Sequence, residues 1–196
     1  RVAAKGWNPE ENPTDKQDRD ALAARGYFEA FASVKKSLGK ILSGKNAGEV
    51  VETDHHVWHA ALFNPAVDAG IIQPKDLAGY RTGPVFIRNS MHTPLPREAL
   101  LDAMEKIFGL LRGEPSPAVR AVLGHHLFVF IHPYFDGNGR LGRFLLNAML
   151  ASGGYPWTVV RLKHRTKYLE TLETASVRDD IRPLARFLAE EMQGGD

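Results

Sequence analysis

The sequence predicts an all-α fold, a helical bundle that includes one short β-hairpin. After residue 20, apolar residues recur every three or four positions in most of the chain, which is the spacing of amphipathic helices. Only the segment 85–96 carries a strand-like apolar run with a turn signal. Because 43% of the 196 residues are hydrophobic, the chain also has enough apolar mass to bury a core.

Composition excludes several classes of protein. Charged residues make up 24% of the chain and the net charge is +2, which excludes a disordered chain and a general nucleic-acid binder. The absence of cysteine excludes disulfides, thiolate metal sites and cysteine nucleophiles. No apolar run approaches the roughly 20 residues of a membrane span, and no signal segment opens the chain. We therefore expect a cytoplasmic protein, or one delivered to a host cytosol if it is an effector, with no membrane or nucleic-acid partner.

Two segments make up the predicted domain organisation. Residues 1–19 are polar and contain Pro9 and Pro13, so we expect them to form a tail or linker. Residues 20–193 are expected to form one domain. The chain begins with Arg1 rather than methionine, which indicates a piece of a longer protein.

The first half of the domain is predicted to contain three helices and the hairpin. Helical spacing covers residues 20–42 and then residues 49–63. The second of these helices is expected to end before Pro65, because the residue that precedes a proline disfavours the helical conformation. The hairpin follows at 85–96, and another amphipathic helix is predicted over residues 98–111.

The second half of the domain is predicted to be entirely helical. Ser116 is a candidate N-cap, with Pro117 at the first helical position. The helix that follows is strongly apolar and should lie at the centre of the core. The four predicted helices cover residues 118–131, 139–152, 166–177 and 183–192.

The loop between the two central helices carries the residues best suited to chemistry. Pro133 ends the preceding helix and leaves His132 at its tip. Gly137 and Gly139 permit a positive φ and a close backbone approach, so their N–H groups can point toward one ligand. The next helix begins at this point, and the free amides of its first turn are suited to binding an anion.

Charged side chains around this loop complete a phosphate site. Arg140 and Arg143 are three residues apart and share one side of the helix, where two cations oppose the helix dipole unless a polyanion binds among them. Asp136 would repel that anion, so a bridging Mg²⁺ is its natural role, and His132 is the general base within reach. These features predict phosphate-transfer chemistry. The alternative is a tight interhelical turn, with Asp136 as a local cap and both arginines solvated.

The same residues resemble a known family. The segment HPYFDGNGRLGR at residues 132–143 is similar to the Fic/Doc motif HPFx(D/E)GNGRxxR, with Tyr134 in the place of the usual phenylalanine. Residues 78–96 resemble the substrate-binding flap of the family. Residues 165–169 and 180–183 resemble its C-terminal helices, so the resemblance covers about residues 50–192.

This resemblance implies a Fic-fold protein that transfers AMP from ATP, with Mg²⁺, to a Ser, Thr or Tyr hydroxyl of a target protein. It implies that His132 is the general base and that Asp136 holds Mg²⁺. Arg140 would bind the β-phosphate and Arg143 the γ-phosphate. The remaining nucleotide-binding residues would be Gly137, Asn138, Gly139 and Tyr168. The flap residues Val85, Phe86 and Ile87 would pair with an extended segment of the target.

Two departures from the family pattern leave alternatives open. Leu169 stands where many members carry a second tyrosine, so the implied transfer could be of UMP, of phosphocholine, or of a phosphate by a Doc-like kinase. A further alternative is a catalytically silent domain that only binds nucleotide. The inhibitory motif [S/T]xxxE[G/N] has no match, and residues 166–171 come closest. An inhibitory segment would therefore precede Arg1, lie on a separate antitoxin chain, or be absent.

Histidines outside the motif have less specific roles. The pattern HHxWH at residues 55–59 lacks a third zinc ligand, so packing or partner contact is the favoured interpretation over a zinc site. For His125 a core position is favoured over support of the active site. His92 is assigned equally to target contact and to capping the hairpin. For Phe86 and Met91, contact with the core is favoured over contact with a target.

Overall fold

The computed structural model of the chain describes residues 16–194 and places seven α-helices among them. These helices are α2 (Lys16–Leu42), α3 (Ala47–Asp68), α4 (Leu100–Gly113), α5 (Pro117–Ile131), α6 (Asn138–Ala151), α7 (Arg165–Val177) and α8 (Arg182–Met192). Three short 3₁₀ helices lie at Pro74–Leu77, Arg97–Ala99 and Leu162–His164. The predicted all-α class is confirmed. Within residues 16–194, no helix is long and apolar enough to cross a membrane.

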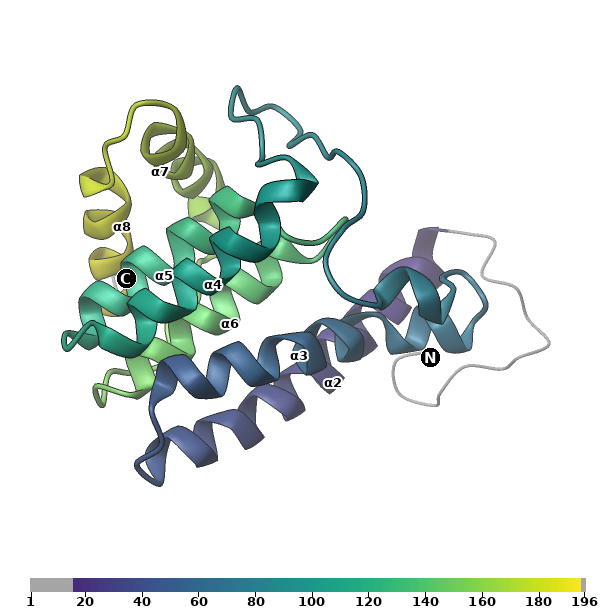
Figure 1. The fold of residues 1–196 in the computed structure, drawn as a ribbon, viewed down its shortest axis with the longest axis horizontal. Helices are drawn as coiled ribbons and strands as arrows, with labels where there is room; N and C mark the ends of the chain where they lie inside the picture. The colour runs from purple at the N-terminus through teal and green to yellow at the C-terminus, as the bar shows by residue number, and fades with distance from the viewer. Residues whose placement is uncertain (1–15, 195–196) are drawn as a thin grey trace.

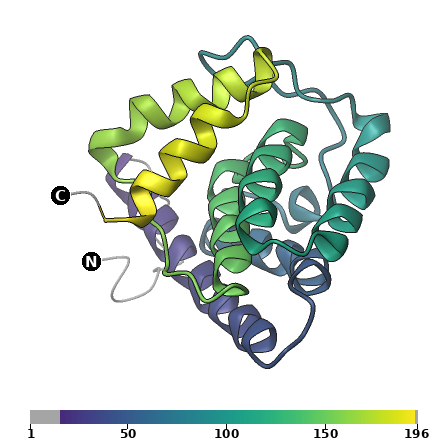
Figure 2. The same ribbon diagram turned by 90° about the vertical axis from the view of Figure 1, so that its left-hand side faces the viewer.

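The helices form a bundle around α5 and α6. The long helices α2 and α3 run side by side along one edge of the molecule, and α7 and α8 cover the opposite edge (Figure 1). The view at right angles shows α5 and α6 in the middle, with α4 on one side of them (Figure 2). The loop that joins α5 to α6 contains the predicted chemical motif, so the motif belongs to the two most enclosed helices.

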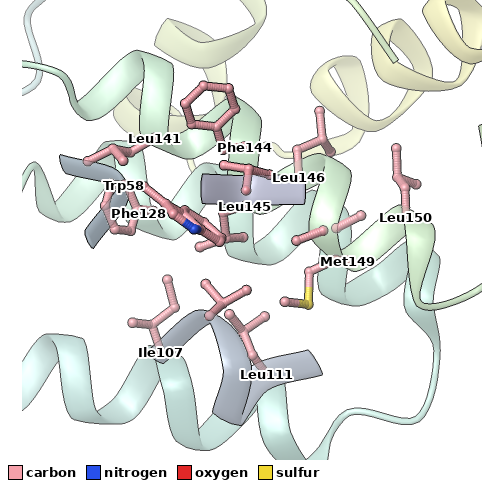
Figure 3. Close-up of a cluster of buried hydrophobic side chains, with 14 of the residues drawn as sticks. Trp58, Ile107, Leu111, Phe128, Leu141, Phe144, Leu145, Leu146, Met149 and Leu150 are labelled. Carbon is pink, nitrogen blue, oxygen red and sulfur yellow. The ribbon is translucent and has the colours of Figure 1, made fainter. Parts of the chain in front are cut away.

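The core is built from one face of each surrounding helix. Trp58 of α3, Phe128 of α5 and Phe144 of α6 are almost completely buried. In Figure 3 the labelled side chains of α6 face Ile107 and Leu111 of α4, with Trp58 and Phe128 beside them. Gly142 allows α5 to approach α6, because a Cβ atom there would lie 2.8 Å from Val129 Cγ2. This packing fixes the end of α5 and the start of α6, which the loop with the predicted motif connects.

Two helix boundaries differ from the sequence prediction. Helix α2 begins at Lys16, so residues 16–19 of the predicted tail are helical, and residues 1–15 lie outside the described part of the chain. Helix α3 continues through Pro65 to Asp68 rather than ending before the proline. Pro65 is buried, and its carbonyl still accepts the N–H of Ala69 at 3.1 Å. Burial of the ring therefore outweighs the one hydrogen bond that proline removes from the helix.

The segment predicted as a hairpin has no β-ladder. Within the described residues 16–194 the structure contains no β-strand, and residues 84–96, the flap loop, are extended on both sides of a turn. The turn is closed by the N–H of Ser90, which donates to the carbonyl of Ile87 at 3.2 Å, while Asn89 has a φ of 59°. Pro84, Pro94 and Pro96 have no N–H to donate, so the two arms cannot form a regular ladder.

Ser116 caps helix α5 as the sequence predicted. Its side chain accepts the N–H of Val119, and Pro117 occupies the first turn. At the other end of α5, His132 occupies the C-cap position. The cap and the proline thus define where the central helix begins, and Pro133 helps to define where it ends.

Candidate active site

His132 lies at the C-cap of α5 in a left-handed conformation. Its φ and ψ are 55° and 59°, and its N–H still donates to the carbonyl of Phe128 at 3.1 Å. This conformation is unfavourable for a residue with a Cβ atom, by about 1–2 kcal/mol. The surrounding contacts must therefore hold it, and strain of this kind concentrates at functional sites.

The imidazole of His132 is held in one tautomer. Nδ1 lies 3.1 Å from the carbonyl oxygen of Val129, which can only accept, so Nδ1 carries the proton and Nε2 presents a lone pair. Burial lowers the pKa of His132 below its ordinary value, and the nearby Arg81 cation lowers it further. The ring is therefore neutral at pH 7, in the form that a general base requires.

Asn138 clamps the loop rather than facing a ligand with its side chain. Its Oδ1 accepts the N–H of Tyr134 at 2.9 Å, and its Nδ2 donates to the carbonyl of Tyr134 at 2.8 Å. The side chain of Asn138 is buried and both of its ends are used. Only its backbone N–H, in the first turn of α6, remains available for an anion.

The start of α6 has the features of an anion site. Gly137 occupies the N-cap position with a φ of 88°, and no side chain of the described residues caps the helix. A Cβ atom at Gly137 would lie 3.1 Å from the ring of Phe63, so both the conformation and the space favour glycine. The first-turn amides, including that of Gly139, therefore concentrate partial positive charge at the loop.

Asp136 and Arg140 form an exposed pair beside this helix start. Asp136 Oδ1 accepts the N–H of Gly137 at 2.6 Å, and Oδ2 pairs with Arg140 Nη2 at 3.1 Å. The side chain of Asp136 is 75% exposed. The guanidinium of Arg140 also lies over the ring of Phe63, 5.1 Å from its centroid. An accessible carboxylate next to a phosphate site fits Mg²⁺, which takes one or two carboxylates and completes its shell with phosphate oxygens and water.

A buried chain of polar contacts positions Arg143. The hydroxyl of Tyr168 lies 2.8 Å from His125 Nε2 and beside the guanidinium of Arg143. Burial lowers the pKa of His125 to about 4, so the ring is neutral, and its Nε2 shares one hydrogen bond with the Tyr168 hydroxyl. His125 is confirmed as a core histidine, and through Tyr168 it also contacts the site. Tyr168 is only 4% exposed, so most of its ring packs in the hydrophobic core.

A cleft of ≈ 730 Å³ brings several predicted residues together. Its volume falls within the range of small-molecule sites in proteins. It lies between the flap loop, the α5–α6 junction and α7, and it is lined in part by Ile87, His132, Gly139, Arg143, Tyr168 and Leu169. Asp136, Gly137, Asn138 and Arg140 are not among the lining residues but occupy the adjoining loop and first turn.

The flap loop presents apolar side chains to solvent. Phe86 is 86% exposed and Met91 is 83% exposed, so the prediction that they contact the core is wrong. Ile87 instead lines the cleft, and Val85 is half-buried.

His92 anchors the flap loop to the protein. Its Nε2 donates to the carbonyl of Phe130 at 2.8 Å, and its ring lies 4.2 Å from the ring of Phe130. Its own N–H donates to Ser90 Oγ at 3.1 Å. These contacts favour the local capping role over contact with a target.

Arg81 and Glu173 contribute to the site and were not predicted from the sequence. Arg81 is 4% exposed and donates from Nε to the carbonyl of His132 at 2.8 Å. Glu173 of α7 accepts the hydroxyl of Ser90 and the N–H of Met91, the latter at 2.7 Å. Most of their partners are backbone groups, which leave no pattern in the sequence. Neither residue could therefore be found from residue spacing.

The histidines of α3 pack against the loop between α5 and α6. His59 Nε2 donates to the carbonyl of Asp136 at 3.2 Å, and its ring stacks on Tyr134 with centroids 3.8 Å apart. The hydroxyl of Tyr134 shares a 2.8 Å hydrogen bond with His56 Nδ1, and His55 Nε2 accepts from Tyr80 at 3.1 Å. Packing is thus the role of this cluster. No group of three or more metal-ligating side chains occurs in the part of the chain that the structure describes.

The sequence matches a known family model and several curated proteins. Residues 52–150 match the family model described as Fic/DOC family. The protein adenylyltransferase Fic of Nematostella vectensis is 39% identical over 124 residues, which cover 61% of this chain and 28% of the relative. The protein adenylyltransferase Fic of Culex quinquefasciatus is 35% identical over 125 residues, which cover 62% of this chain and 24% of the relative. The chain therefore matches only about a quarter of the length of these curated relatives.

A solved structure supports the fold across the whole chain. Fic-1 (residues 134–508) from C. elegans superposes with a TM-score of 0.75 at 23% sequence identity, covering 98% of this chain and 53% of that one. The predicted Fic-fold helical bundle is confirmed by this likeness. The family model covers half of the chain and includes the complete loop between α5 and α6. On this evidence the chain belongs to the Fic/DOC family.

Proposed function

We propose that this protein transfers AMP from ATP, with Mg²⁺, to a Ser, Thr or Tyr hydroxyl of a target protein. One observation carries the proposal: a neutral histidine of fixed tautomer lines the same ≈ 730 Å³ cleft as Arg143 and the first turn of α6. General base, cation and helix N-terminus are the groups that transfer of a nucleotide requires. The printed names of the relatives, which are protein adenylyltransferases, support the same reaction.

The start of α6 and the two arginines are suited to the triphosphate. The amides of the first turn would hold the α-phosphate, where negative charge increases during transfer. Arg143, beside Tyr168, would bind a terminal phosphate oxygen from within the cleft. Arg140 would turn from Asp136 to a second phosphate, leaving that carboxylate to hold Mg²⁺. The metal ion, when bound, would neutralise part of the phosphate charge.

His132 would supply the proton transfer. Its Nε2 would accept the proton of the target hydroxyl as the hydroxyl oxygen bonds to the α-phosphorus and pyrophosphate leaves. The carbonyl of Val129 holds Nδ1–H throughout, so the imidazolium that forms keeps one hydrogen bond already in place. The lowered pKa keeps the base form populated at neutral pH.

The flap loop is suited to binding the target. An extended target segment would add its backbone to residues 85–87 and present a hydroxyl to His132. Phe86 is exposed beside this position and would contact an apolar residue of the target. Leu169 lines the cleft where many family members carry a second tyrosine, which leaves the base of the nucleotide open. The experiment therefore tests a second nucleotide besides ATP.

The test is label transfer to protein, run with the purified chain and a cell lysate. ATP labelled on the α-phosphate is compared with ATP labelled on the γ-phosphate, with Mg²⁺ present, and UTP is tested in parallel. We expect protein-bound α-label that His132→Ala abolishes, while thermal melting and ATP binding of that variant stay close to wild type. Label from the γ-position alone would contradict the proposal and indicate a kinase. Transfer by His132→Ala at the wild-type rate would contradict the assigned base.

A further inference from the structure

The buried side chain of Arg81 connects the two stems of the flap loop. The described residues form no ladder across this loop, so its two stems need another connection. The guanidinium of Arg81 supplies a buried one, because Nη1 donates to the carbonyl of Gly83 at 2.8 Å and Nη2 donates to the carbonyl of Leu95. At the exposed base of the loop, Arg97 Nη1 also donates to the carbonyl of Thr82. Gly83 precedes the loop and Leu95 lies near its end. One buried side chain therefore holds both stems together.

The same arginine also holds the catalytic loop. Its third donor, Nε, reaches the carbonyl of His132 at 2.8 Å, and its backbone N–H donates to the carbonyl of Pro133 at 2.9 Å. His132 is in the left-handed conformation, so its carbonyl has left the hydrogen-bond pattern of α5. Arg81 is the partner that this carbonyl has instead. The contact stabilises a backbone conformation that is otherwise unfavourable.

We propose that Arg81 is a positioning residue for AMP transfer, which holds the backbone of His132 and the two stems of the flap loop in one fixed arrangement. The inference rests on the proposed function. The base at His132 and the target segment on the flap loop must meet within hydrogen-bond distance. The planar guanidinium, with donors in a fixed fork, connects the two parts without touching nucleotide or target.

The charge of Arg81 gives the proposal a second consequence. Burial disfavours protonation of the His132 ring, and the hydrogen bond to the Val129 carbonyl favours it. Among the charged or titratable groups nearby, Arg81 and His92 disfavour protonation and Asp136 favours it. Removal of the Arg81 charge should therefore raise the pKa of His132. A lysine at position 81 would keep the charge but could not reach three carbonyls in different directions.

The experiment uses two substitutions that separate geometry from charge. Arg81→Lys should lower kcat for AMP transfer about 10²-fold, because small misplacements of a reacting group have costs of this size. The KM for ATP should change little, since Arg81 does not line the cleft. Amide hydrogen exchange in the flap loop should become faster. The His132 pKa, read from its ring resonances by NMR, should stay low in Arg81→Lys and rise in Arg81→Gln.

Arg97→Lys is the matched control. Arg97 donates from Nη1 to the carbonyl of Thr82 at 3.2 Å, close to the same stem, but it is exposed and does not contact His132. We expect wild-type kcat and a wild-type His132 pKa in this variant, with at most a small change in exchange at the base of the loop. The control therefore separates loss of an arginine near the flap loop from loss of the link to His132.

Two results would overturn the proposal. One is wild-type kcat with wild-type flap exchange in folded Arg81→Lys, and the other is an unchanged His132 pKa in folded Arg81→Gln. If Arg81→Gln does not fold, the kcat and exchange of Arg81→Lys decide. If the wild-type protein transfers no AMP, the proposed function fails, while flap exchange and the His132 titration still test the positioning role.

Discussion

Asn138 and Arg81 both hold backbone in the candidate site, and the motif reveals neither role. Asn138 lies within the motif, yet its amide spans the backbone of Tyr134 rather than facing the cleft. Arg81 lies outside the motif and contacts the backbone of His132, the proposed base. A residue within the motif can therefore have a purely structural side chain, and a residue outside it can support the site. The role of a residue follows from where its donors and acceptors point.

Tyr134 is the one motif position at which this chain departs from the family pattern. Its hydroxyl bonds to His56, which is exposed, so Tyr134→Phe leaves His56 able to bond to water. We expect a loss of about 1 kcal/mol in the free energy of unfolding, the usual value of one hydrogen bond. The ring still stacks on His59, so AMP-transfer activity should stay within about twofold of wild type.

Urea unfolding and label transfer check this prediction, with His56→Ala as the partner substitution. The double variant should lose little more stability than the more damaging single one, because both changes remove the same hydrogen bond. A fully additive loss would show that the Tyr134–His56 contact does not contribute. A collapse of activity in Tyr134→Phe would show that the hydroxyl does more than pack the loop.

At the scale of elements, the flap loop is held from two directions rather than by its own backbone. Arg81 joins its stems, and Glu173 of α7 accepts the hydroxyl of Ser90 and the N–H of Met91 at its tip. The hydrogen bonds from Ser90 and Met91 also lower the pKa of Glu173. A loop held at a few points can open locally without global unfolding. This arrangement is consistent with the proposed binding of a target segment at the flap loop.

Substitution of Glu173 should therefore loosen the tip of the flap loop. Glu173→Gln removes the carboxylate charge that strengthens both hydrogen bonds, so the amide of Met91 should exchange faster by severalfold. The melting temperature should change little, because Glu173 is close to solvent and its bonds are confined to the loop. Hydrogen exchange measured by mass spectrometry or NMR provides the test.

Glu170→Gln is the control for this variant, since Glu170 is exposed on the same helix one turn earlier. It should leave the exchange of Met91 at the wild-type rate. Equal exchange in Glu173→Gln and wild type would mean that the tip is held by other contacts, such as the His92 anchor.

The whole molecule carries buried neutral histidines that make its stability depend on pH. Burial lowers the pKa of His55 to about 3 and that of His59 to about 4, against 6.5 in the unfolded chain. Below pH 6.5 the unfolded chain binds protons that the folded protein does not, so stability falls as the pH decreases. Each such histidine contributes at most about 1.4 kcal/mol per pH unit in this window.

We therefore expect the free energy of unfolding to be nearly constant above pH 7 and to fall between pH 6.5 and pH 4. Glu191, whose pKa is lowered to about 2, adds a loss only below pH 4.5 and so does not explain the upper part of the window. Urea unfolding at a series of pH values checks this. His59→Phe should reduce the slope between pH 6.5 and pH 5. An unchanged slope in that variant would show that His59 does not contribute.

Sequence and tertiary structure determined different parts of this protein. The helices, the Ser116 cap and the motif between α5 and α6 follow from local spacing, so the sequence predicted them to within a few residues. The end of α3 did not follow, because burial of Pro65 depends on neighbours distant in the sequence. The same holds for the flap loop, whose arms are held by Arg81, Glu173 and His92 rather than by each other.

The sequence by itself indicated the all-α class and the family, because helical spacing and the motif at residues 132–143 are matters of residue type and order along the chain. Only the tertiary structure decided which groups hold the site together. The donors of Arg81 and the acceptors of Glu173 mainly meet backbone atoms, and every residue supplies the same backbone atoms. Contacts of that kind depend on where the chain passes in space, so they become visible only when the fold brings α7, the flap loop and His132 together.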